Sequence, residues 1–147
     1  MDYIEVKSNG TIVVKKGTNP RVPYNHQKDA MSKLSLIDKE KSFSTLVVLP
    51  TGGGKTYTAS TWLLKNAIDK NKKIIWIAHR QILLDQAAKS FQEFAYIETM
   101  PHINEFTYRI ISGSAEHDRS IDISEKDNIL ILSKDSIAVS YTHLTLP

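Results

Sequence analysis

The chain has 147 residues, of which 41% are hydrophobic and 24% are charged, and it contains no cysteine. This composition is typical of an ordinary globular domain, and it excludes disordered and collagen-like chains, disulfide frameworks and zinc sites built from thiolates. The 19 Lys and Arg residues against 16 Asp and Glu leave a formal charge of +3, which is compatible with a polyanionic partner but too small to indicate one by itself.

The first predicted element is a small β-hairpin within residues 1–18. β-Branched runs lie on both sides of Asn9-Gly10, and Asn-Gly is the dipeptide most favoured at the tight turn of a hairpin. The segment Gly17-Thr18-Asn19-Pro20 then marks a boundary. We therefore predict an N-terminal hairpin over residues 1–18 and a main domain over residues 19–139.

The main domain is predicted to alternate helices with apolar strands. Apolar residues from Asn25 to about Lys39 fall on one face of a helix, and the continuous apolar run Ser44–Pro50 is typical of a strand covered on both faces. The same patterns predict, in chain order, a helix from Thr56 to about Asn71, a strand at Lys73–Ala78, a helix at Arg80–Ala95, and strands at Phe106–Ile111 and Asn128–Leu132. This alternation indicates an α/β fold, with a parallel sheet and flanking helices.

A glycine-rich segment joins the apolar run to the following helix, and it reads Thr51-Gly52-Gly53-Gly54-Lys55-Thr56. Glycines let backbone N–H groups turn toward a phosphate at the positive end of a helix. Lys55 would supply charge for the β- and γ-phosphates, and the Thr56 hydroxyl would be a ligand for nucleotide-bound Mg²⁺. The pattern G-x-x-x-x-G-K-[ST] is met at Gly54-Lys55-Thr56, with Leu49 in place of its first glycine. We predict a nucleoside triphosphate site in which Lys55 and Thr56 are catalytic; the alternative is a flexible turn.

This loop and two flanking segments resemble motifs of superfamily 2 helicases. The segments are Leu49–Thr56, Arg21–Ala30 and Ile75–Ala87. They are similar to the DEAD/DEAH-box-like branch that includes the motor subunits of type I and type III restriction enzymes. The resemblance implies an incomplete RecA-like phosphate-loop NTPase domain of an ATP-dependent helicase or translocase. It also implies that Gln27 reads adenine, whose N6 and N7 edge an amide can satisfy; the alternative is a polar residue opening a helix.

The same resemblance implies a nucleic-acid interface. Arg80 follows the strand Lys73–Ala78, and open parallel sheets bind ligands outside the carboxyl ends of their strands. Ser112, Gly113 and Ser133 fall where the family has further backbone-contacting segments, although threonine is commoner at the place of Ser133. Such contacts position a strand without reading its sequence. We expect DNA as the partner, with RNA as the alternative; Arg80 could instead be a surface cation that opens a helix.

Two parts of the family's hydrolytic machinery do not occur in the sequence. There is no Asp-Glu-x-His box and there are no second-domain motifs, and the resemblance assigns to these the activation of water and the stabilising arginines. We therefore expect nucleotide binding with negligible turnover. Residues 140–147 lose the amphipathic texture that precedes them and resemble translated sequencing-adaptor sequence, so the native frame is expected to stop near Ala138 or Val139; the alternative is an irregular native C-terminus.

Two other functions remain open at this point. A phosphate-loop kinase would need an acceptor pocket and a lid, and a non-enzymatic module would only bind nucleotide or nucleic acid. The chain has no run of about 18 apolar residues and no leader-like N-terminus. We therefore expect a cytoplasmic location and no membrane contact, while nothing in the sequence indicates an oligomeric state.

Overall fold

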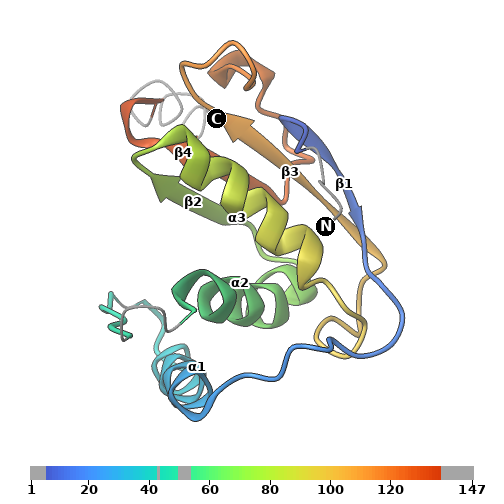
Figure 1. Ribbon diagram of the computed structural model, residues 1–147, viewed down its shortest axis with the longest axis vertical. Helices are drawn as coiled ribbons and strands as arrows, with labels where there is room; N and C mark the ends of the chain where they lie inside the picture. The colour runs from blue at the N-terminus through green and yellow to red at the C-terminus, as the bar shows by residue number, and fades with distance from the viewer. Residues whose placement is uncertain (1–5, 43, 50–53, 137–147) are drawn as a thin grey trace.

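The computed structural model describes residues 6–42, 44–49 and 54–136, and it shows a mixed α/β fold (Figure 1). The sheet has four strands in the order β1-β3-β4-β2. The strands are β1 (Asn9–Val13), β2 (Ile74–Ala78), β3 (Glu105–Ile111) and β4 (Ile129–Ser133), the α-helices are α1 (Asn25–Ile37), α2 (Lys55–Asn66) and α3 (Gln81–Glu93), and the short 3₁₀ helices are η1 (Ile68–Lys70), η2 (Ser120–Asp122) and η3 (Lys134–Ser136). Among these residues, no helix is both long and apolar enough to cross a membrane.

The centre of the sheet is parallel, as predicted. Strand β4 lies between β2 and β3 and runs parallel to both, and all five of its residues are buried. Ala78 of β2 lies opposite Ser133, and Ile111 of β3 lies opposite Leu132. The carboxyl ends of the three strands therefore meet at one edge of the sheet, to which we refer as the carboxyl edge.

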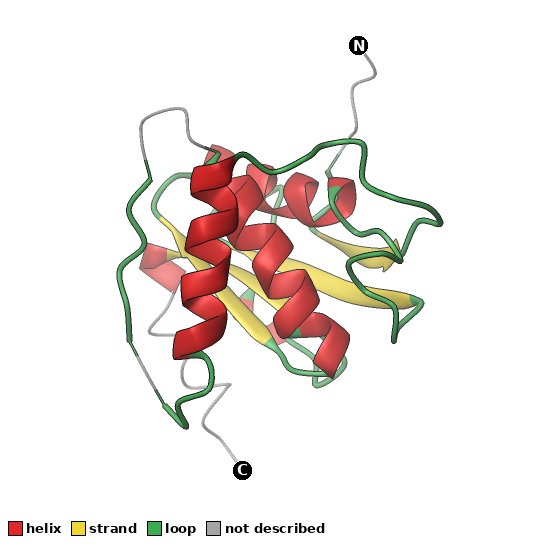
Figure 2. Cartoon of the chain, turned by 90° about the horizontal axis from the view of Figure 1, so that it is seen from below, coloured by secondary structure: helices red, strands yellow, loops and turns green. Residues whose placement is uncertain are grey.

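The helices gather on one face of the sheet. Helix α3 lies over the strands, with α2 beside it and α1 farther away (Figure 1), and α1 and α2 run side by side in front of the strands in Figure 2. The core between α3 and the sheet is apolar and sealed: Phe91, Leu84, Ile110 and Ile131 are all 0% exposed. Burial of these side chains holds the sheet and the helical layer together.

The opposite face of the sheet is only partly covered. Leu130, Leu132 and Ile111 are buried there with Ile123, which belongs to the connection between β3 and β4. The side chains of Ile75 and Ile77 on β2 are 50% and 51% exposed. The apolar sequence of β2 predicted a strand that is buried on both faces. In the structure, β2 is covered on one face only.

The predicted N-terminal hairpin turn is wrong. Asn9 and Gly10 do not form a turn but lie inside β1, opposite Arg109 and Tyr108 of β3 in an antiparallel pair. The Asn-Gly signal is local, and a long-range strand partner with good side-chain contacts overrides it. Strand β1 is thus an edge strand of the main sheet. The predicted tail, residues 140–147, lies outside the described residues.

The predicted strand Ser44–Pro50 is also wrong over the part that the structure describes. Residues 44–49 form no strand and join no sheet, and Leu46 and Val48 are 84% and 78% exposed. Leu49 is buried, and the segment shares a cavity with α1. An apolar run reports a tendency to be buried, but a strand also needs a partner for its backbone groups. No strand within the described residues provides one.

Candidate nucleotide site and nucleic-acid edge

Gly54 occupies a backbone position that strongly favours glycine. It precedes α2 with φ 71° and ψ 48°, in the left-handed region. A Cβ atom there would lie 2.3 Å from Nε2 of Gln27 and 3.0 Å from Nη2 of Arg21. The Gly54 carbonyl accepts a hydrogen bond from the Thr58 hydroxyl at 2.9 Å. The end of the predicted phosphate loop is therefore closely packed from the α1 side.

Gln27 links the start of α1 to this glycine. Its side chain is 1% exposed, and its Oε1 accepts a hydrogen bond from the backbone N–H of Tyr24 at 2.8 Å. Oε1 thus satisfies one of the N–H groups that helix α1 leaves unpaired at its start, while Nε2 lies against Gly54. The amide combines a helix-capping position with contact to the phosphate loop. Its predicted role in reading adenine stays a prediction.

Arg21 is held by two aromatic rings next to the loop. Its Cζ lies 4.1 Å from the ring centre of Tyr57 and 5.7 Å from that of Phe94, and the two rings meet edge to face at 4.8 Å. Burial raises the pKa of Tyr57, and the positive charge of Arg21 opposes that change. Cation–π contacts of this kind fix a guanidinium while leaving its N–H donors available. Sequence reasoning assigned no role to Arg21 beyond its place in a motif.

A cavity of about 540 Å³ opens beside the start of α2. It is lined by Arg21, Gly54, Lys55, Thr56, Tyr57, Gln86, Lys89, Ser90, Glu93 and Phe94. Lys55 and Thr56 are exposed in the first turn of α2, where the helix dipole favours an anion. Three cationic side chains against one carboxylate make the lining suitable for a polyphosphate. The predicted site residues Thr51, Gly52 and Gly53 lie outside the described residues.

The residues predicted to contact nucleic acid lie along the carboxyl edge. Arg80 is exposed and precedes α3, two residues after β2 ends. Ser133 ends β4, where its hydroxyl pairs with that of Ser136 at 2.8 Å, and Ser112 and Gly113 follow β3. Since neighbouring strands are about 4.8 Å apart, these segments span roughly 10 Å of the edge. The structure therefore brings the predicted interface residues to one edge.

The Ser112 hydroxyl faces inward. It lies 2.5 Å from Nδ1 of His117, whose Nε2 lies 2.9 Å from Oδ1 of Asp85 on α3. Because the Asp85 carboxylate only accepts, Nε2 carries a proton, and in the neutral ring Nδ1 then accepts from the Ser112 hydroxyl. Ser112 Oγ also accepts from the backbone N–H of Ser114 at 3.1 Å. Sequence reasoning missed this chain of hydrogen bonds because no short spacing connects Asp85 with His117.

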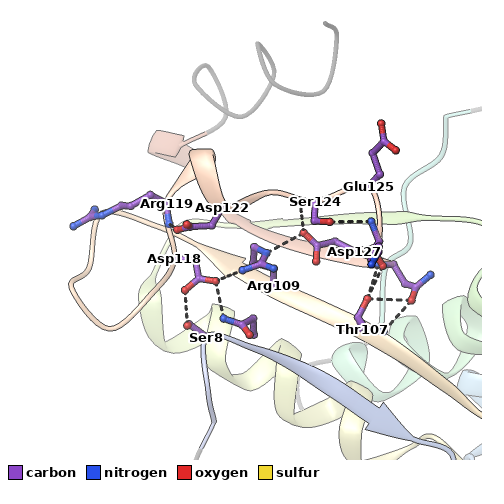
Figure 3. Close-up of polar contacts among 12 residues, drawn as sticks. Ser8, Thr107, Arg109, Asp118, Arg119, Asp122, Ser124, Glu125 and Asp127 are labelled. Carbon is purple, nitrogen blue, oxygen red and sulfur yellow. Dashed lines mark hydrogen bonds and ion pairs between the residues drawn. The ribbon is translucent and has the colours of Figure 1, made fainter. Parts of the chain in front are cut away.

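Ser112 and His117 belong to the loop that follows β3. A second polar cluster fixes the end of this loop at Asp118 (Figure 3). Arg109 on β3 donates to Asp118 and to Asp127, the latter at 2.9 Å. Burial acts to lower the pKa of Arg109, but the hydrogen bonds and charges of its two carboxylate partners raise it above the usual value. Burial likewise acts to raise the pKa of Asp118, but three hydrogen bonds hold it below its usual value; the donors are Ser8, Asn9 and Arg109.

Comparison with known families identifies the chain. A family model described as the res subunit of type III restriction enzymes matches residues 21–145, which include the phosphate loop and the whole carboxyl edge. No curated protein and no solved structure gives a significant match. The expected resemblance to helicase-like restriction motors is thereby confirmed. The chain belongs to the family of type III restriction enzyme res subunits, which are ATP-dependent helicase-like proteins.

Proposed function

We propose that this chain binds ATP with Mg²⁺ as the nucleotide-binding part of a DNA translocase. The observation that carries the proposal is the conformation of Gly54. This glycine has a positive φ, packs closely against Gln27 and precedes α2 beside a cationic cavity. Lys55 would bind the β- and γ-phosphates and Thr56 would bind Mg²⁺, which supplies charge neutralisation when bound. Arg21 lines the same cavity and would contact the rest of the nucleotide, and Gln27, which packs against Gly54, would read adenine as the family resemblance implies.

The proposal separates binding from hydrolysis. The 147 residues contain no Asp-Glu-x-His sequence, and among the described residues that line the cavity Glu93, near the end of α3, is the single carboxylate. Activation of water in this class of reaction needs a carboxylate and a positioned nucleophile. We therefore infer that the chain by itself binds ATP and turns it over negligibly.

DNA is the proposed polymer because the family acts on DNA and because the carboxyl edge carries exposed cations. Arg80 and Lys134 are exposed next to the ends of β2 and β4. Phosphate contacts from such side chains give affinity without base specificity.

Isothermal titration of the purified chain with ATP and Mg²⁺ tests the nucleotide site. Lys55→Ala is expected to weaken ATP binding at least about tenfold, since a direct charge on the phosphates is lost. Lys65→Ala is the matched control, because Lys65 is exposed in the last turn of the same helix. Unchanged ATP affinity in Lys55→Ala would rule out the phosphate-loop assignment. Transfer of phosphate to a small molecule would instead indicate a kinase.

A further inference from the structure

The loop that follows β3 contains an exposed arginine that no other part of the proposed function uses. Arg109 and Arg119 lie within ten residues of each other, but their surroundings differ. Arg109 is held between Asp118 and Asp127. Arg119 is exposed, and it forms no ion pair with any residue that the structure describes. Figure 3 shows its side chain extending away from the Arg109 cluster. Of the two arginines, Arg119 is therefore the one with charge to offer a ligand.

Arg119 lies at the carboxyl edge. Its Nη1 donates to the backbone carbonyl of Ser112 at 3.3 Å, which keeps the guanidinium beside the end of β3. A groove of about 350 Å³ opens there, lined by Ile111, Ser112, Gly113, Arg119, Ser120, Ile121, Asp135 and Ser136. A guanidinium has five N–H donors, so one bond to a carbonyl leaves most of them for a phosphate.

The loop that carries Arg119 is pinned at several points. His117 is bonded to Ser112 and, across to α3, to Asp85. Asp118 is bonded through its side chain to Arg109, and its backbone N–H donates to the carbonyl of Ile110 at 2.9 Å. A loop fixed in this way loses little further conformational freedom when a ligand binds. At Gly113, in contrast, no atom of the described residues lies within 4 Å of the place where a Cβ atom would stand.

We propose that Arg119 contacts the phosphodiester backbone of a nucleic-acid strand in the groove at the carboxyl edge, and that His117 positions the loop 112–119 for this contact. The inference rests on the proposed function and adds a binding residue and a positioning residue to it. Two acidic residues limit the strength of the site. Asp135 lines the groove, and Asp122 accepts the backbone N–H of Arg119 at 2.8 Å. The site therefore holds phosphate through one cation and geometry, not through a dense basic patch.

Fluorescence anisotropy of labelled oligothymidine and oligouridine of about 20 nucleotides, measured over a range of salt concentrations, tests the contact. Loss of one phosphate contact on a single strand lowers the slope of log K against log salt by about 0.7. Arg119→Ala is expected to show this decrease on both oligonucleotides, and Arg119→Lys is expected to retain the wild-type slope. Lys126→Ala is the control, because Lys126 is exposed just before β4 begins, at the opposite edge of the sheet.

Two further variants test the loop. Asp135→Asn removes from the groove a negative charge that repels phosphate, and it is expected to tighten binding of the oligonucleotides about two- to threefold. His117→Gln is expected to weaken binding in the wild-type chain but to have no further effect in Arg119→Ala, because His117 acts through Arg119.

The outcomes separate this inference from the proposed function. If wild type binds with a salt-dependent affinity but Arg119→Ala keeps the wild-type slope, the inference is wrong and the proposed function stands. Additive losses for His117→Gln and Arg119→Ala would overturn the positioning role. If wild type binds neither oligonucleotide while it still binds ATP, the inference is wrong and the ATP-binding part of the proposed function stands.

Discussion

Gly54→Ala tests the packing of the phosphate loop against α1. Two terms add at this position. A residue with a side chain at φ 71° costs about 1–2 kcal/mol relative to glycine. The new Cβ would also lie 2.3 Å from Nε2 of Gln27, and relieving such a contact in a packed site costs about 1–3 kcal/mol. Gln27 cannot swing away freely, because it is 1% exposed and Oε1 is bonded to Tyr24. Gly54→Ala is therefore expected to lower the free energy of unfolding by about 2–5 kcal/mol.

Gly17→Ala is the matched control for this experiment. Gly17 also has a positive φ, 93°, but within the described part of the chain nothing lies within 4 Å of the position of its Cβ. The entropy that alanine removes from the unfolded chain is common to both sites, so it cancels in the comparison. Urea unfolding followed by circular dichroism gives both free energies. Gly54→Ala is expected to cost about 1–3 kcal/mol more than Gly17→Ala, and most of this excess should disappear in a Gln27→Ala background, where only the contact with Arg21 remains. Equal costs at the two glycines would refute the packing of Gln27 over Gly54.

Two other predictions concern the Arg109 cluster. Arg109→Met leaves two largely buried carboxylates without their cation, and we expect it to lower the free energy of unfolding in urea by about 2–4 kcal/mol. The control is Lys33→Met, at an ion pair whose side chains are 70% and 64% exposed, which should lower it by less than about 0.5 kcal/mol. Similar losses for the two variants would contradict a stabilising role of the Arg109 cluster. The pKa of Asp118 is lowered by folding, so its contribution to the free energy of unfolding is present above about pH 4, the unfolded value, and is lost as pH falls through the folded one. The free energy of unfolding of Asp118→Asn should therefore fall less steeply than that of wild type below about pH 4. An unchanged dependence on pH in this range would contradict the prediction.

Local patterns predicted most of the elements but not all of their partners. The helical periodicity found α1, α2 and α3, and the apolar runs found β2, β3 and β4, because each of these signals reports burial in the element itself. The Asn9-Gly10 turn failed because β3 supplies a partner 100 residues away that no local window can detect. The run at residues 44–49 failed because strand formation depends on neighbours as well as on apolar character.

The candidate sites also contain some features that a local sequence pattern predicts and others that it does not. A cavity lies beside Gly54, Lys55 and Thr56, where the local pattern predicts a phosphate site, and this pattern is readable in sequence because phosphate binding uses consecutive backbone and side-chain groups. The stacking of Arg21 on Tyr57 and the bond between His117 and Asp85 join residues that lie 36 and 32 positions apart. Contacts of this length depend on how α2 and α3 pack, and one sequence carries no signal for them.

The pairing of β1 with β3 has a consequence for the order of events during synthesis. Asn9 pairs with Arg109 and Val13 with Glu105, and Ser8 and Asn9 bond to Asp118, so the first strand has no partner in the sheet until roughly 90–100 further residues have been made. At about 5–20 residues per second, this segment waits roughly 5–20 s on the ribosome. The contacts among α1, α2 and α3 are available earlier. The pairings of β1 with β3 and of β2 with β4 are later, long-range steps that raise the contact order and slow folding.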